Sequence, residues 1–268
     1  LPFSWTFLWA SLGFFILEGA KTRRVLPADS MLAAYTGILL LSSFMAFNPS
    51  VSYANLSLYW NWVIVYLLIT NIVVTEERFL VFMLAFLLYS TKMSQHGVQS
   101  YAERGGAFAE WGATGTPGWF QNSGEFGIQM CIFFPLSLYF IQSLPPYWSR
   151  PKLLVFLFMP LSAVISIIAS SSRGAQLGLV PVIGWMLMRT KHRVKTSTVA
   201  GVLGVLVWFA LPAEQKAPFS SMGEDETSSS RITYWKRGLE IMRDRPITGA
   251  GFKNWEVYTL SKYGAFVN

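Results

Sequence analysis

The sequence predicts an all-α membrane protein with about eight transmembrane helices. Hydrophobic residues make up 53% of the 268 residues, charged residues make up only 13%, and the mean hydropathy is +0.40. A soluble domain usually carries roughly 25% charged residues to cover its surface. The apolar residues also occur in long blocks between short charged clusters, which is the pattern of a polytopic helical membrane protein. This composition excludes a disordered, collagen-like, coiled-coil or disulfide-rich chain.

The apolar blocks predict the spans in order, because a helix needs about 20 residues to cross a bilayer. In lipid the backbone groups must find partners within the chain, which favours helices. The fourth block is short, and Arg173 lies at the start of the seventh. The blocks lie at about 2–19, 28–47, 56–74, 79–92, 125–143, 153–170, 174–189 and 196–212.

Basic residues in the short connections predict the orientation. Clusters of Lys and Arg follow the first, fifth and seventh spans, whereas the connection at 48–55 holds neither. Since the basic side of a membrane protein faces the cytoplasm, we expect the loop at about 93–124 and the segment 213–268 to lie outside. The chain thus divides into a transmembrane bundle, 1–212, and the start of a large outer segment, 213–268. An apolar start at Leu1 predicts a fragment of a longer protein.

The numbers of cysteine and histidine residues and the net charge limit the ligands and reactions that we expect. Cys131 is alone and the two histidines, His96 and His192, are far apart, so we expect no disulfide, metal or cofactor. His96, near the outer end of the fourth span, is a weak candidate for a general base, whereas His192 is expected in the cytoplasmic basic cluster in contact with water. The net charge is +7, and in a membrane protein it predicts contact with lipid and not with nucleic acid.

The first candidate site is the polar interruption at 170–177, which reads SSSRGAQL. The serine Ser172, the arginine Arg173 and the amide of Gln176 gather at the predicted start of a helix. This combination favours binding of an anion. A second interpretation is that Arg173 only extends along the helix end to reach water.

The second candidate is an amphipathic helix at about 229–243. Ile232, Trp235, Leu239 and Met242 recur at spacings of three and four residues, and Arg245-Pro246 ends the helix. One interpretation places the helix in the headgroup zone, with its basic residues on lipid phosphates. The other places Arg231 over the same cavity as Arg173, with Trp235 and Lys236 in support. The spacing does not separate the two.

The third candidate is the start of the fifth span, where Asn122 or Ser123 is expected to cap the helix and Glu125 lies in its first turn. The alternative is that Asn122 and Glu125 recognise a sugar or an arginine. In the outer loop before them, Trp111 and Trp119 are expected at the membrane interface or stacked on sugars.

Two of these stretches resemble the O-antigen ligase and O-antigen polymerase superfamily of bacterial inner-membrane proteins. They are SSSRGAQLGL at 170–179 and SSRITYWKRGLEIMRDRPITGAGF at 229–252. The resemblance implies a helical fold of the C-type glycosyltransferase class. It also implies transfer of a glycan from undecaprenyl diphosphate, on the periplasmic face, to lipid A core, a growing polysaccharide or a protein.

The resemblance further implies which residues act. Arg173 and Arg231 map to the family's two diphosphate-binding arginines, and transfer would invert the anomeric carbon without a metal. The family's catalytic histidine would lie beyond Asn268, since neither His96 nor His192 matches it. Two other classes stay open: a transporter or flippase of the lipid-linked saccharide, and a structural membrane subunit. The lack of acidic residues in the middle of the spans weighs against ion-coupled transport.

Overall fold

The computed structural model of the chain describes most of its residues. The described ranges are 2–17, 26–106, 112–116, 120–144, 149–191, 193–210, 216 and 226–264. Within them the secondary structure is helical, with no strand. The chain forms two units, one made of residues 1–80 with 223–268 and the other of 81–222. The predicted all-α class therefore holds for the described residues.

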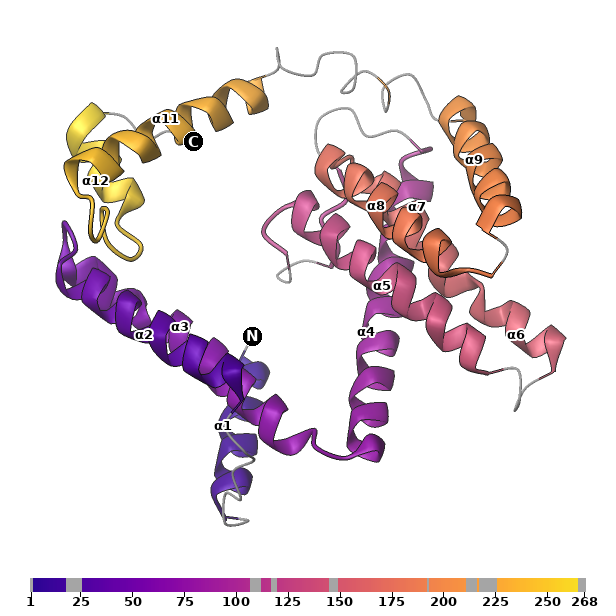
Figure 1. The fold of residues 1–268 in the computed structure, drawn as a ribbon, viewed down its shortest axis with the longest axis horizontal. Coiled ribbons are helices and arrows are strands. Elements are labelled where there is room, and N and C mark those ends of the chain that lie inside the picture. Colours follow the sequence, from indigo (N-terminus) through magenta and orange to yellow (C-terminus); the bar gives the residue numbers. More distant parts are fainter. Residues whose placement is uncertain are drawn as a thin grey trace. The chain divides into compact units, whose positions relative to one another are not determined.

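The first unit joins the N-terminal helices to the outer segment (Figure 1). Its helices are α1 (Pro2–Leu17), α2 (Pro27–Phe44), α3 (Pro49–Ile72), α11 (Glu226–Asp244) and α12 (Trp255–Tyr263). Helix α3 contacts both α1 and α2. It begins well before the predicted residue 56, because Asn48 is its N-cap and Pro49 follows at the first helical position, where no backbone N–H is needed.

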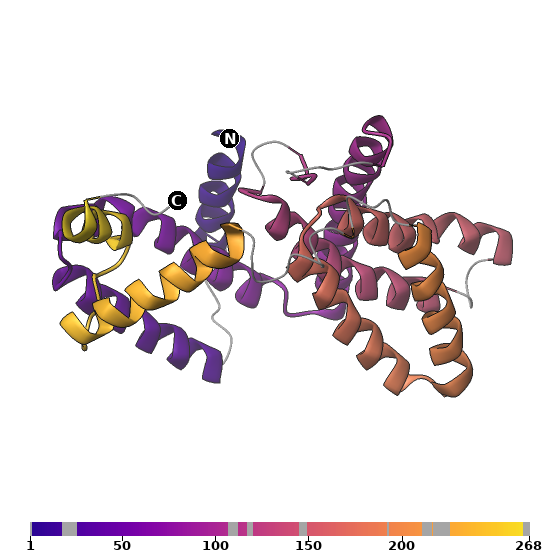
Figure 2. The same cartoon turned by 90° about the horizontal axis from the view of Figure 1, so that it is seen from above.

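The second unit is a helical bundle centred on α5 (Figure 2). Its helices are α4 (Glu76–Glu103, which begins in the first unit), α5 (Ser123–Ser143), α6 (Arg150–Phe156), α7 (Phe158–Ala169), α8 (Arg173–Arg189) and α9 (Arg193–Ala210). Helix α5 packs against α7 and α8, and its side chains Phe126, Met130 and Phe133 are completely buried at the centre.

Small residues let the helices of this bundle approach closely. A Cβ on Gly97 of α4 would lie 2.3 Å from Ser166 Oγ of α7, and the hydroxyls of Ser94 and Ser162 are 2.8 Å apart. Close contacts of glycine and serine with hydroxyl bonds between helices are typical of membrane bundles. They also explain a correction: residues 93–103, expected in the outer loop, continue α4.

The expected span at 153–170 is broken at Leu157 into α6 and α7. Pro160 has no N–H to donate to the carbonyl of Phe156, four residues earlier, so the regular ladder cannot continue through this point. By length and apolar composition, α5 qualifies as a membrane span among the described helices, and Thr6–Leu17 and Leu153–Ala169 are shorter apolar stretches. The count of eight spans therefore stays a prediction.

Candidate functional site

The first turns of α5 and α8 lie side by side in the second unit. A Cβ on Gly124 would be 3.0 Å from Asn122 Oδ1 and 3.5 Å from Ser172 Oγ. One turn further, a Cβ on Gly127 would be 2.5 Å from Ala175 Cβ, so only glycine fits. Two of the three sequence-predicted candidates, 170–177 and 120–127, therefore form a single structural site.

A capped start holds Arg173 at the first position of α8. The side chain of Ser172 accepts a hydrogen bond from the N–H of Ala175, and the N–H of Ser172 donates to Ser170 Oγ at 3.3 Å. Ser171 has a φ of +50°, the left-handed region that a residue with a Cβ disfavours. Such conformations are kept where the surroundings hold them and are common at functional sites. Arg173 itself is half-buried.

The outer loop closes over this turn. The N–H of Ala113 donates to the carbonyl of Ala169 at 2.8 Å, and a Cβ on Gly112 would collide with the backbone of Ser170. Thr116 reaches back to the sulfur of Met93 on α4 at 3.1 Å. The loop residues 112–116 are thus packed against the bundle. Trp111 and Trp119, expected at the interface or on sugars, lie outside the described residues.

The start of α5 confirms the capping interpretation. Asn122 Oδ1 accepts from the N–H of Glu125 at 2.9 Å, and Glu125 Oε2 accepts from the N–H of Gln121 at 2.9 Å. Of the two expected caps, Asn122 is the one used and Ser123 is the first helical residue. Glu125 therefore helps to hold the helix start.

These contacts give the site a positive character. The first turns of two helices lie side by side here, and each helix N-terminus carries a partial positive charge. Arg173 adds a full charge there, and the carboxylate of Glu125 offsets part of it. Gln176 is half-buried one turn into α8. The arrangement is chemically suited to hold an anion near the bundle surface.

The helix expected at 229–243 is α11, in the first unit. The side chains of its apolar stripe are exposed. The exposed fractions of Ile232, Trp235, Leu239 and Met242 lie between 52% and 75%. The face that packs inside the unit is formed instead by Ile241, which is 4% exposed, and by half-buried residues such as Gly238. Arg231 and Lys236 are exposed on this helix.

Asn254 docks the outer segment onto the ends of α2 and α3. It is completely buried, its Oδ1 accepts from the N–H of Asn48 at 2.8 Å, and its Nδ2 donates to Ser52 Oγ at 2.8 Å and to the carbonyl of Phe252 at 2.9 Å. Gly251, with a φ of +101°, lies so close to Ala46 that a Cβ would be 2.3 Å from the Cβ of Ala46. Sequence reasoning missed Asn254.

A polar cluster joins α11 to α12. Lys262 forms an ion pair with Asp244, and the hydroxyl of Tyr258 donates to the same carboxylate at 2.8 Å. The hydrogen bonds from Lys262 and Tyr258 hold the pKa of Asp244 below its ordinary value, and the bond to Asp244 raises the pKa of Lys262. Both partners of the ion pair are therefore ionised at neutral pH, and acid that protonates Asp244 removes its stabilising contribution.

Arg237 also belongs to the contact between α11 and α12. Its guanidinium lies over the ring of Tyr263, 4.3 Å from the centroid, and the hydroxyl of Tyr263 donates to Glu240. The Nη1 atom of Arg237 is buried and has no hydrogen-bond partner among the described residues. Arg237 therefore packs within the unit and is not a side chain that meets only lipid headgroups.

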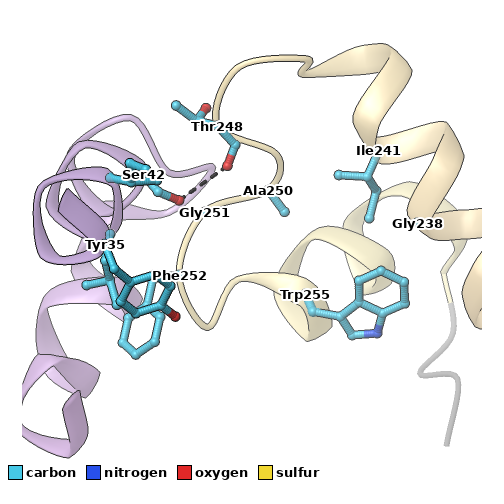
Figure 3. Close-up of a pocket in the computed structure, with 11 residues that line it drawn as sticks. Tyr35, Ser42, Gly238, Ile241, Thr248, Ala250, Gly251, Phe252 and Trp255 are labelled. Atoms are coloured by element: carbon cyan, nitrogen blue, oxygen red, sulfur yellow. Dashed lines mark hydrogen bonds between the residues drawn. The ribbon is translucent and has the colours of Figure 1, made fainter. Parts of the chain in front are cut away.

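A cavity of about 330 Å³ lies between α2, α11 and the turn at 248–252 (Figure 3). Tyr35 lines it from α2, and Ile241 and Trp255 line it from α11 and α12. Ser42, at its edge, donates to the carbonyl of Thr248 at 3.2 Å. Most of the lining is apolar or aromatic, so the cavity suits a hydrocarbon or the face of a ring.

The histidines add little to either site. His96 is half-buried on α4, and His192 lies outside the described residues. Among the described residues, no group of three or more His, Cys, Asp and Glu side chains is placed to hold a metal ion.

The close-packed glycine and serine contacts between helices are consistent with a helical membrane protein, and the positive helix start offers a place for an anionic ligand. The family is given by comparison, since the model described as O-antigen ligase matches residues 153–266. This match supports the resemblance of the chain's motifs to the O-antigen ligase and polymerase superfamily. Searches of curated proteins and of solved structures found no match.

The matched segment runs from α6 to α12 and includes both Arg173 and Arg231. The family implies transfer of a glycan by a glycosyltransferase of the O-antigen ligase or polymerase type. Its substrates are, in general, a lipid-linked glycan and an acceptor. The family also implies a bacterial membrane as the location.

Proposed function

We propose that the chain transfers a glycan from undecaprenyl diphosphate to an acceptor on the periplasmic face of the bacterial inner membrane. Arg173 and Arg231 hold the diphosphate in this proposal. The observation that carries it is the capped helix start at 170–176, where Arg173 and two helix N-termini concentrate positive charge. A diphosphate is the part of a lipid-linked glycan that such a site recognises.

The chemistry follows from the leaving group. The acceptor hydroxyl oxygen attacks the anomeric carbon, the bond from that carbon to the diphosphate oxygen breaks, and the configuration inverts. The electron pair leaves with the diphosphate, whose growing charge the two guanidinium groups stabilise. The hydroxyl proton passes to a base, which the resemblance implies is a histidine beyond Asn268. We expect no step to need a metal.

Arg231 brings a second feature to the proposal. Gly238 lies seven residues further along α11, which is two turns on the same face and about 10 Å along the axis. Gly238 lines the apolar cavity of the first unit. When Arg231 binds the diphosphate, the first isoprene units of the undecaprenyl carrier can reach this cavity. Trp235 lies next to this face, and Trp235 and Lys236 are the supporting candidates.

The test replaces each arginine by lysine in the full-length parent and measures glycan transfer in a null strain, with membrane levels checked by blot. Lysine keeps the charge but cannot hold two phosphate oxygens in a planar fork. One lost charge-assisted bond is worth about 1.5–3 kcal/mol, so we expect transfer to slow by about tenfold to a hundredfold.

Arg243→Lys is the matched control, because Arg243 is an exposed arginine of the same helix and only its charge should matter. Normal transfer by both Arg173→Lys and Arg231→Lys would refute the diphosphate site. The alternative, a flippase for the same lipid, is separated by assaying transfer in detergent. There the two membrane faces no longer exist, so a flippase has no function while a transferase still forms product.

A further inference from the structure

The exposed stripe of α11 is the largest feature that the proposed function leaves unused. Ile232, Trp235, Leu239 and Met242 lie on one side of the helix, because they are three or four residues apart. Each is more than half exposed. Inside the unit the far side of the helix is already packed, with Ile241 buried.

Basic residues border this stripe on both edges. Arg231 precedes Trp235 by one turn and forms one edge. Lys236 follows Ile232 by one turn, Arg243 follows Leu239 by one turn, and together they form the other edge. All three are exposed. An apolar stripe between two basic edges is the pattern of a helix that lies in the plane of a membrane surface.

Two hydrogen bonds join the C-terminal end of α11 and the turn after it to the connection between α2 and α3. Arg245 Nη1 donates to the carbonyl of Met45 at 3.2 Å, and the N–H of Phe47 donates to the carbonyl of Ala250 at 2.9 Å. Both partners belong to the connection between α2 and α3, which the charge pattern places at the outer ends of two spans. On that predicted topology, the C-terminal end of α11 lies at the height of the membrane surface.

We propose that α11 lies on the outer surface of the bilayer, with the stripe Ile232, Trp235, Leu239 and Met242 in the acyl–headgroup boundary. Lys236 and Arg243 bind lipid phosphates along its edge. Phospholipid is the occupant because a basic border complements phosphate, whereas a protein partner would cover the charges as well. Trp235, an aromatic residue with one polar atom, is suited to this depth. The proposal does not depend on which glycan is transferred.

The experiment measures depth in the bilayer. The full-length parent with Cys131→Ser carries a single nitroxide label at Leu239→Cys or Met242→Cys. A label at Glu256→Cys, on exposed α12, is the control. The proteins are reconstituted in vesicles of phosphatidylethanolamine and phosphatidylglycerol without glycan donor. Collision of the label is measured with oxygen, which concentrates in lipid, and with a water-soluble nickel chelate.

The expected result is a several-fold higher ratio of oxygen to nickel collisions at Leu239 and Met242 than at Glu256. Labels as open to nickel as the one at Glu256 would overturn the proposal. Labels shielded from both reagents would also overturn it, because a protein then covers the stripe. Two labelled positions guard against one variant that fails to fold.

A second arm tests the basic edge. Adding Lys236→Glu and Arg243→Glu to the Leu239 label should lower its oxygen collisions, whereas Lys236→Arg with Arg243→Lys should not. An unchanged depth with both glutamates would overturn the role of these residues. Since no donor lipid is present, these outcomes are independent of the arginine test of glycan transfer.

Discussion

Replacing Asn254 by alanine is expected to detach the segment 245–258 from the ends of α2 and α3. The asparagine side chain makes three hydrogen bonds in a fully buried place, with Asn48, Ser52 and the carbonyl of Phe252. Alanine removes all three and leaves the partly buried N–H of Asn48 without this acceptor. A net bond is worth about 1 kcal/mol, so the three bonds give about 3 kcal/mol, and the partly buried N–H of Asn48 adds up to about 2 kcal/mol; we therefore expect a loss of about 3–5 kcal/mol.

Hydrogen exchange of the reconstituted parent protein measures this loss directly. Each 1.4 kcal/mol changes an equilibrium tenfold, so amides of α12 should exchange about a hundredfold to a few thousandfold faster. Asn254→Asp should also lose protection, because the carboxylate still accepts from Asn48 but can no longer donate to the carbonyl of Phe252.

Lys253→Gly is the control at the neighbouring position. Lys253 is exposed and has a φ of +57°, which glycine adopts without steric cost, so protection should be retained. If Asn254→Ala exchanges within threefold of the parent, as roughly 0.7 kcal/mol would allow, the three bonds do not hold the segment.

Three further predictions concern the same unit. Gly251→Ala should destabilise it by about 2–4 kcal/mol in a thermal melt, since the new Cβ meets Ala46 at an unfavourable φ. Gly238→Leu should fill the cavity and slow transfer, whereas Gly238→Ala, whose Cβ meets nothing closer than 4.0 Å, should not. Protection of α12, corrected for intrinsic exchange, should stay flat from neutral pH to about 3.9 and fall below it. The reason is that ionised Asp244, whose pKa is lowered in the folded state, contributes stability that protonation removes, and Asp244→Asn should abolish this acid dependence.

Local signals predicted the starts of α5 and α8 well. Asn122 and Ser172 are residue types whose short side chains reach the free N–H groups of a first turn, and both cap a helix within two residues of the predicted start. The helical nature of α11 was also predictable from its spacing. The end of α4 was not, because Gly97 reads as a helix breaker until Ser166 of another helix is placed against it.

The sequence did not predict the contacts between residues that are far apart in the chain. Nothing near Asn254 distinguishes it from an exposed asparagine in a turn, since its partners Asn48 and Ser52 lie about two hundred residues away. Arg237 has the spacing of the exposed basic residues of α11, but its guanidinium packs on Tyr263 of α12. Periodicity defines the faces of a helix, and only the fold decides which face another segment covers.

The first unit is discontinuous in sequence, and this has a consequence for biosynthesis. Ser52 donates to the carbonyl of Phe252, so the ends of α2 and α3 receive their partner only after two hundred further residues are made. At about 5–20 residues per second, that interval lasts roughly 10–40 s. During this time the N–H of Asn48 is open to water, to a lipid headgroup or to another chain. A helper at the insertion site, or slow pairing with a neighbouring copy, would act on the protein in this interval and no later.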